Sequence, residues 1–585
     1  MVNMEQPDQT LTFEHLTEIA SLAEAPKGAL KAAAKKGEWV RLRGGNALFQ
    51  PGDIADSIYF VKSGVLGAFH RASDGELELL GYIRSGEPVG EMAFLAAAPH
   101  ASPVYALRDT ELVKFSRTVF DKLVAKHPAL LRGLAQLMVG RMRSNRRSNA
   151  EDRSQPKVFA MLASSPTISC KFLARQLADK LAKFGKSVIV IGPEAAKSGL
   201  EWFDQQERAH DVVLLHSPIA DSAWFRLCLR QADRLWVIGR ADAHPSDPLL
   251  PVEDSPARAM RLVDVILLHN ENQRAVSAGK DWKQAAGAAR IFHWRTGNSE
   301  DVTRIARTAA GRSVGLVLSG GGARAYAHIG AVRALREANI PIDFCGGTSM
   351  GAIIAANVAM GWDDAKIERT IIESFVDSNP VDDYILPVVA LTRGAKVRRR
   401  LAKHYGDMQI ENMALPFFCL STNLTSGHSS IHRNGLLRKA LCASIALPGV
   451  LPPVVIDHEV HVDGAVLNNF PVDVMQDFHR GPVLGIDVSQ VRGLDAAEFV
   501  EPPGFFSWIM KHGIHNAPPI ASLLMRTATL STSNLDARRS DADILILPEM
   551  DDIDLRDWKA FDRATEAGYT ATVKALDQGL LDGLR

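Results

Sequence analysis

The feature that most constrains this chain is a serine flanked by glycines, in the sequence Gly347-Thr-Ser-Met-Gly351. A G-x-S-x-G turn places its serine on a tight bend between a strand and a helix. Small flanking residues let the backbone turn there and let a substrate approach the hydroxyl. The pentapeptide therefore predicts an α/β element that presents Ser349 as a nucleophile.

Two other segments complete a reaction centre of this kind. An apolar run from Val314 breaks into Gly320, Gly321 and Gly322, whose unhindered N–H groups can stabilise the oxyanion of acyl transfer. Much further along, Asp463 ends a second short apolar run. Because a serine hydroxyl needs a neighbour to accept its proton, Asp463 is the candidate base. Together these segments predict a serine hydrolase.

Length and composition set broad limits. A chain of 585 residues should hold three or four domains. Its 67 basic and 67 acidic residues balance, so no overall field favours nucleic acid. The five cysteines include no C-x-x-C pair, which predicts neither zinc nor a disulfide framework and fits a reducing compartment. Without a leader pattern or an apolar stretch of about 18 residues, we expect a cytoplasmic protein that meets a membrane only peripherally, at its inner face.

Residues 15–150 are predicted to form a barrel or jelly roll, because short apolar runs alternate with Gly, Pro and Asp. The region resembles a cyclic nucleotide-binding domain. The matching residues are Phe49-Gln-Pro-Gly52, Val61-Lys-Ser-Gly64 and Gly90-Glu-Met-Ala-Phe-Leu95.

In that family the Gly-Glu pair and a later arginine hold the ribose and the cyclic phosphate. Here Gly90 and Glu91 match, but His100 stands where the arginine is expected. Losing a bidentate guanidinium removes the strongest phosphate contact available. Two alternatives follow: a cyclic nucleotide site at these three residues, or a barrel kept for docking or regulation. The second is favoured.

Residues 157–300 alternate apolar strands with helical stretches, which predicts a doubly wound parallel sheet. Ser164–Phe172 lies where a phosphate loop would follow the first strand. It has no glycine, and Phe172 follows Lys171 where a metal-binding Ser or Thr is expected. This predicts a degenerate P-loop-like layer that hydrolyses no nucleotide.

Residues 312–490 closely resemble the patatin-like phospholipase family, which implies a hydrolase domain of the α/β class. The whole layout resembles the neuropathy-target-esterase branch, which also places cyclic nucleotide-binding-like modules before the hydrolase. Several motifs in one order are far more specific than the pentapeptide alone. The matching segments are 320–324, 328–330, 346–351, 391–394, 443–449, 463–465 and 468–471.

The resemblance implies a Ser349–Asp463 dyad that cleaves acyl esters of phospholipids or lysophospholipids through an acyl-enzyme, without metal or organic cofactor. For Asp463 to act as a base, a partly dry site must raise its pKa. Arg324 is expected to hold the glycine loop or to face a lipid phosphate. Asp343 is expected to bond the nearby backbone, with catalysis as the alternative. Further motif support comes from Gly347, Gly351 and Gly464.

Three rival hypotheses remain open. Gly320-x-Gly322-x-x-Ala325 followed by Asp343 also fits a dinucleotide fingerprint. A Ser–Asp–His triad could use His479 or His512 as base. The third is a non-catalytic, lipid-binding or scaffolding pseudoenzyme.

Two segments are candidates for meeting a membrane. Residues 491–585 form a C-terminal extension, expected to be helical and interfacial, in which aromatics at 503–512 adjoin cationic residues. The basic run Lys396–Arg400, with Lys403, could meet anionic head groups. A buried aromatic run and a solvated helix face are the alternatives.

Overall fold

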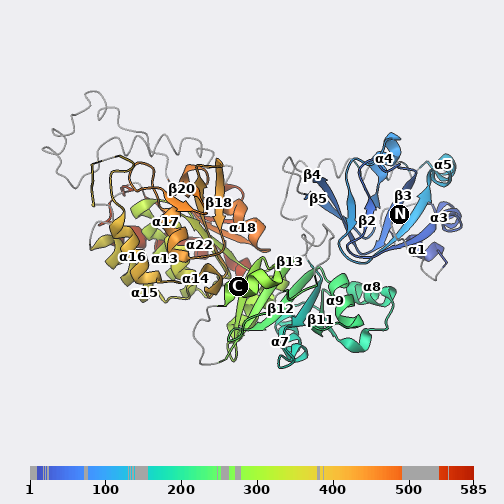
Figure 1. The fold of residues 1–585 in the computed structure, drawn as a ribbon, viewed down its shortest axis with the longest axis horizontal. Coiled ribbons are helices and arrows are strands. Elements are labelled where there is room, and N and C mark those ends of the chain that lie inside the picture. Colours follow the sequence, from blue (N-terminus) through green and yellow to red (C-terminus); the bar gives the residue numbers. More distant parts are fainter. Residues whose placement is uncertain are drawn as a thin grey trace. The chain divides into compact units, whose positions relative to one another are not determined.

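The computed structural model describes residues 10–585 with gaps. The longer gaps are 72–76, 139–155, 252–261, 271–277, 378–382 and 490–538; shorter ones are 18, 20–21, 23–25, 129–130, 132–133, 135–137, 247, 387, 551 and 556. The described chain forms three successive domains, coloured blue, cyan to green, and yellow to red in Figure 1. Among the described residues, no helix combines the length and the apolar content needed to cross a bilayer.

The N-terminal domain is a jelly roll of two four-stranded antiparallel sheets, ordered β1-β8-β3-β6 and β2-β7-β4-β5. Apolar side chains from both sheets, such as Val40 and Leu66, form the core between them. This confirms the predicted jelly roll. Its elements are α1 (Phe13–Thr17), α3 (Lys27–Ala34), β1 (Glu38–Leu42), β2 (Ala47–Phe49), β3 (Ser57–Ser63), β4 (Val65–Arg71), β5 (Leu77–Arg84), β6 (Pro88–Val89), α4 (Glu91–Ala96), β7 (Val104–Ala106), β8 (Thr110–Ser116) and α5 (Arg117–Lys126).

The middle domain contains a six-stranded sheet, ordered β10-β11-β9-β12-β13-β14, in which β10, β11, β9 and β12 pair in parallel. The loop between β9 and α7 holds no glycine that could wrap a phosphate. Its elements are β9 (Val158–Ala163), α7 (Cys170–Lys183), β10 (Val188–Ile191), α8 (Leu200–Ala209), β11 (Val212–Pro218), α9 (Ala223–Gln231), β12 (Arg234–Arg240), β13 (Leu262–His269), α11 (Gly279–Ala286), β14 (Arg290–Arg295) and α12 (Ser299–Ala309).

The third domain is built on an eight-stranded sheet, ordered β19-β20-β17-β16-β15-β21-β22, with β18 paired to β17. The neighbouring strands β17, β16, β15, β21 and β22 pair in parallel, and β18 and β20 run antiparallel to β17. Its strands are β15 (Gly315–Leu318), β16 (Phe344–Thr348), β17 (Phe417–Asn423), β18 (His428–His432), β19 (Val454–Ile456), β20 (Glu459–Asp463), β21 (Val483–Ile486) and β22 (Ile544–Ile546). Its helices include α13 (Ala327–Glu337), α14 (Met350–Ala359), α15 (Asp364–Ile371), α16 (Ala395–Tyr405), α17 (Leu437–Ser444), α18 (Val472–Phe478) and α22 (Phe561–Asp577).

The C-terminal residues belong to this same domain. β22 pairs in parallel with β21, and α22 packs against α13. The two helices meet at Gly330 and Gly568, where an added Cβ would overlap the backbone of the facing helix. The sheet therefore continues past residue 490, where the sequence suggested that the hydrolase domain ends. The aromatic segment 503–512 lies outside the described residues.

Candidate active site

Ser349 occupies the bend between β16 and α14. Its φ of 54° lies in the left-handed region, which is unusual for a residue with a Cβ. The turn also needs its glycines: a Cβ on Gly347 would lie 2.6 Å from the Leu318 carbonyl oxygen, and one on Gly351 would overlap the same oxygen. The Ser349 amide donates to Ser444 Oγ at 3.0 Å. The bend is thus fixed from both sides, with the hydroxyl at the carboxyl edge of the sheet.

Asp463 reaches the serine from the end of β20. Its backbone pairs with Ser421 of β17, the strand that neighbours β16, and its amide donates to the Ala446 carbonyl at 2.9 Å. This register places Asp463 Oδ2 2.7 Å from Ser349 Oγ, although the two residues are 114 positions apart along the chain. Asp463 Oδ1 accepts the Ala465 amide at 2.9 Å. The hydroxyl and the carboxyl are therefore within proton-sharing distance.

Burial sets the ionisation of this carboxyl. Asp463 is fully buried, and the loss of solvation raises its pKa to about 7, against the opposing effect of the Ala465 amide and the Ser349 hydroxyl. A buried carboxyl resists the charged form because the surroundings solvate it poorly. The carboxyl is consequently more basic than an exposed aspartate.

The glycine loop runs beside the serine: a Cβ on Gly320 would lie 3.1 Å from Ser349 Cβ. The Gly320 amide is already used, because it donates to the Asn469 carbonyl at 3.2 Å while Asn469 Nδ2 donates back to the Gly320 carbonyl at 3.0 Å. The amides of Gly321 and Gly322 have no acceptor among the described residues. The expectation of three free donors is corrected to two.

Buried polar groups hold this loop in place. Arg324 is buried, and its Nε donates to the Ile553 carbonyl at 2.7 Å, so it ties the loop to the C-terminal segment and does not face solvent. His328 Nε2 lies 2.9 Å from the Ser319 carbonyl, and burial lowers the His328 pKa to about 4. The imidazole is therefore neutral and donates to that carbonyl.

The described residues of the rival hypotheses, Asp343 and His479, do not contact the Ser349–Asp463 pair. Asp343 lies six residues before Ser349; it is buried and accepts hydrogen bonds from Arg307 Nε at 2.9 Å and from the Val314 amide at 3.0 Å. His479 packs on Gly315 at the start of β15, and its ring bonds the Met475 carbonyl at 3.0 Å. It lies at the opposite end of the strand from the glycine loop. His512 is outside the described residues.

Two residues of the site had no role assigned from the sequence. Ser444 holds the Ser349 amide, and Asn469 holds Gly320. Both lie within segments whose motifs match the patatin-like family, 443–449 and 468–471. The motif match was the available signal, but a hydrogen bond to a distant backbone group has no local pattern in the sequence.

The three cyclic nucleotide candidates lie together in the jelly roll. Gly90 has φ 79° and precedes α4, and Glu91 is buried. The His100 ring stacks on Phe49 with 3.7 Å between ring centroids, and a Cβ on Gly90 would lie 3.1 Å from His100 Cε1. Burial lowers the His100 pKa, with Asp53 and Asp56 opposing the shift. At neutral pH a largely uncharged ring thus stands where the family has an arginine.

Family models match all three domains. A cyclic nucleotide-binding domain matches residues 39–127, a neuropathy target esterase family P-loop like domain residues 157–310, and a patatin-like phospholipase residues 316–475. An uncharacterized NTE (neuropathy target esterase) family protein of Mycobacterium tuberculosis is 30% identical over 579 residues, covering 96% of both chains. This chain belongs to the NTE family.

Other NTE-like relatives are longer. Human patatin-like phospholipase domain-containing protein 6 is 26% identical over 91% of this chain and 44% of its own length. The lysophospholipase nte1 of Aspergillus niger is 25% identical over 91% of this chain and 41% of its own length. This NTE family member thus spans less than half of those two relatives.

The raised pKa of Asp463 predicts a stability effect. The ordinary pKa of aspartate is 3.8, and in the folded protein the pKa of Asp463 is about 7. Between these two pH values the unfolded chain loses the carboxyl proton while the folded chain keeps it, so the free energy of unfolding falls as pH rises. The full difference corresponds to roughly 4 kcal/mol. Asp463→Asn removes the titrating carboxyl and with it this loss of stability. We therefore expect the variant to be more stable than the parent, by a margin that widens up to about pH 7 and then levels off.

Thermal unfolding of the two proteins across this pH range measures the margin. Asp541→Asn, at an exposed position of the same domain, is the matched control and should leave the margin near zero. A stability difference between the two proteins that does not change between about pH 4 and pH 7 would contradict the raised pKa of Asp463.

The neutral His100 ring predicts weak binding of cyclic nucleotides. Replacing a charge-assisted bidentate contact costs about 3 kcal/mol, roughly a hundredfold in affinity. We expect no saturable heat from cAMP or cGMP below about 1 mM near neutral pH, and tighter binding by His100→Arg. Isothermal titration checks this, and saturable micromolar binding by the parent protein would show that the domain holds the phosphate by other groups.

Proposed function

We propose that this chain is a serine esterase that hydrolyses acyl esters of phospholipids or lysophospholipids. The observation that carries the proposal is the 2.7 Å hydrogen bond from Ser349 to Asp463, whose pKa of about 7 suits a general base at neutral pH. Membership of the NTE family and the lysophospholipase named among its relatives support the lipid substrate class.

The reaction would proceed in two steps. Asp463 accepts the proton of Ser349 Oγ as this oxygen attacks the ester carbonyl carbon, and the amides of Gly321 and Gly322 donate to the resulting oxyanion. Collapse breaks the ester C–O bond, and Asp463 returns the proton to the departing alcohol. Asp463 then takes a proton from water as the water oxygen attacks the acyl carbon; the bond from that carbon to Ser349 Oγ breaks, Asp463 returns the proton to Oγ, and the fatty acid leaves.

The α14 helix contributes to this chemistry through its position. Ser349 immediately precedes the helix, so the positive end of the helix dipole lies beside the place where negative charge develops. Ser349 is buried, with 7% of the residue exposed, and its base Asp463 is fully buried.

For the N-terminal domain we propose a regulatory or docking role. Its jelly roll retains the Gly90-Glu91 turn, but the neutral His100 ring does not replace an arginine. The retained fold is compatible with such a role, which requires no cyclic nucleotide.

The nucleophile assignment is tested by substitution and by covalent labelling. Ser349→Ala should abolish hydrolysis of lysophosphatidylcholine and of a water-soluble ester, a loss of at least about a thousandfold, because no other group forms the acyl-enzyme. A fluorophosphonate should label the parent protein on the peptide that contains Ser349. The matched control is Ser429→Ala, an exposed serine of β18, which should keep full activity.

Unchanged turnover in Ser349→Ala, or a label mapped to another serine, would refute the nucleophile. A correctly folded parent protein that neither turns over esters nor takes the label would favour the pseudoenzyme alternative.

A further inference from the structure

A loop of the hydrolase domain displays an unusual group of aliphatic side chains. Ile385, Leu386, Val388 and Val389 are between 36% and 89% exposed. Single exposed aliphatic residues are common on soluble proteins, but a cluster within five positions marks an interaction surface. We call these four residues the apolar loop.

The base of the apolar loop is held by backbone hydrogen bonds. The Ile385 amide donates to the Leu391 carbonyl at 3.0 Å, and Tyr384 forms a β-bridge with Thr392. Asp383 continues this base into α16, because its Oδ2 accepts the amide of Ala395, the first helical residue, at 2.7 Å. The loop and the helix that follows it are therefore one structural element.

The same element is joined to the segment that positions the dyad. The amides of Leu391 and Thr392 donate to the carbonyls of Gly449 at 2.8 Å and Val450 at 3.1 Å. A few residues earlier, Ser444 holds the Ser349 amide and Ala446 holds the Asp463 amide. Residues 444–450 thus connect the base of the apolar loop to the candidate active site.

The carboxyl edge of the sheet carries further exposed aliphatic residues. β20 pairs with residues 421–423 of β17, beyond Leu420, which pairs with Thr348. The hairpins of β17, β18, β19 and β20 therefore extend past the edge at which Ser349 lies. Exposed on them are Leu424, Val455 and Val460.

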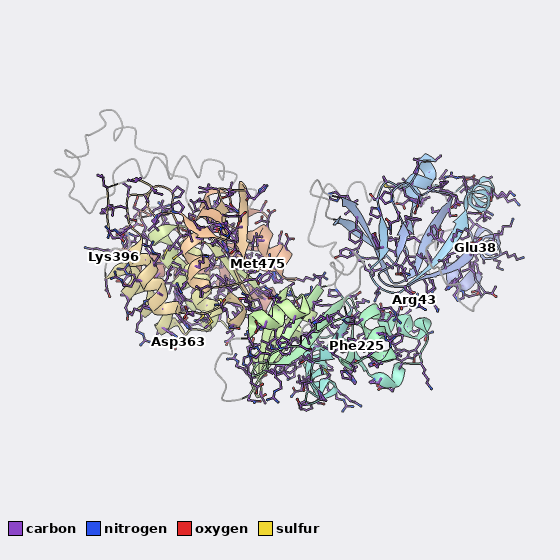
Figure 2. All side chains as sticks on the ribbon, in the orientation of Figure 1. Glu38, Arg43, Phe225, Asp363, Lys396 and Met475 are labelled. Carbon is purple, nitrogen blue, oxygen red and sulfur yellow. The ribbon has the colours of Figure 1, made fainter. Side chains whose placement is uncertain are left out.

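The charge around the apolar loop is predominantly positive. Residues 384–406 include six Lys or Arg and no Asp or Glu, in a chain whose overall charge is balanced. Arg393, Arg398 and Arg399 are exposed, and no carboxylate of the described residues pairs with them. Lys396 also belongs to α16 (Figure 2). Lys403, near the end of this helix, forms an ion pair with Glu373 at 2.7 Å. The surface combines aliphatic side chains with unpaired guanidinium groups.

We propose that the apolar loop and the basic face of α16 dock this domain on an anionic phospholipid bilayer. The aliphatic side chains enter the boundary between head groups and acyl chains, and the arginines meet the lipid phosphates. The inference rests on the proposed function, since a lipid esterase must bring its serine to an interface, and it adds the surface that does so.

The charge pattern favours a bilayer over the other occupants of an apolar patch. In a symmetric dimer through this surface, the arginines of the two copies would face one another and repel. Nucleic acid would attract the arginines but would leave the aliphatic side chains in water. An anionic bilayer satisfies both groups at once.

The test measures vesicle binding separately from catalysis. Full-length protein carrying Ser349→Ala, which prevents lipid turnover, is sedimented with vesicles of phosphatidylcholine alone or with roughly 30% phosphatidylserine. We expect binding to the anionic vesicles, reduced by about tenfold or more in Leu386→Asp/Val388→Asp. Arg398→Glu/Arg399→Glu should weaken binding to the anionic vesicles and reduce its dependence on salt.

The matched control is Leu580→Asp, at an exposed leucine beyond α22, which should bind as the parent does. With Ser349 intact, Leu386→Asp/Val388→Asp should hydrolyse p-nitrophenyl butyrate at the parent rate, which shows that the fold is preserved. If the parent hydrolyses no ester but still binds vesicles through the loop, the proposed function fails while the docking surface stands.

Vesicle binding that is unchanged in both double variants would overturn the inference. So would a change of oligomeric state in sedimentation velocity with vesicle binding intact, because the loop would then contact a second copy of the chain.

Discussion

The hydrogen bond between Ser349 and the buried Asp463 is the interaction on which the site depends. A carboxyl without solvent is costly to ionise, so burial raises the Asp463 pKa, and the register of β17 and β20 brings the carboxyl to 2.7 Å from the Ser349 hydroxyl. Opening this site to water would return the carboxyl to the basicity of an ordinary aspartate. The geometry of the surrounding backbone therefore determines the chemistry available to the serine.

The backbone around the dyad is held from several directions. Ser349 keeps a left-handed φ because Ser444 and two glycine contacts fix the bend. On the other side, Asn469 and Gly320 exchange two hydrogen bonds that fix the glycine loop beside the nucleophile. A conformation of this kind costs energy and persists only where neighbours impose it. The arrangement leaves the amides of Gly321 and Gly322 without an acceptor among the residues that the structure describes.

Much of this architecture could be predicted from sequence, for identifiable reasons. The strand, glycine turn and G-x-S-x-G bend carry local patterns, and so do the short strands of the jelly roll and the alternating elements of the middle domain. The pairing of Ser349 with Asp463 came from motif order and not from local chemistry. What could not be predicted depends on contacts between distant segments: the use of the Gly320 amide by Asn469, the Arg324 bond to Ile553, and the addition of β22 to the sheet. The apolar loop was also missed, because exposure cannot be read from an aliphatic run that would equally suit a buried strand.

The role of Asp463 as the base is tested most directly by measuring the pKa of its carboxyl. Infrared difference spectra between the parent protein and Asp463→Asn isolate the carbonyl band of the protonated Asp463 carboxyl as pH is varied. We expect a band that is present in mild acid and disappears with a midpoint near pH 7, because burial raises the pKa of Asp463 to about 7. A midpoint near 4 would show a solvated, ordinary aspartate and would contradict the proposed base.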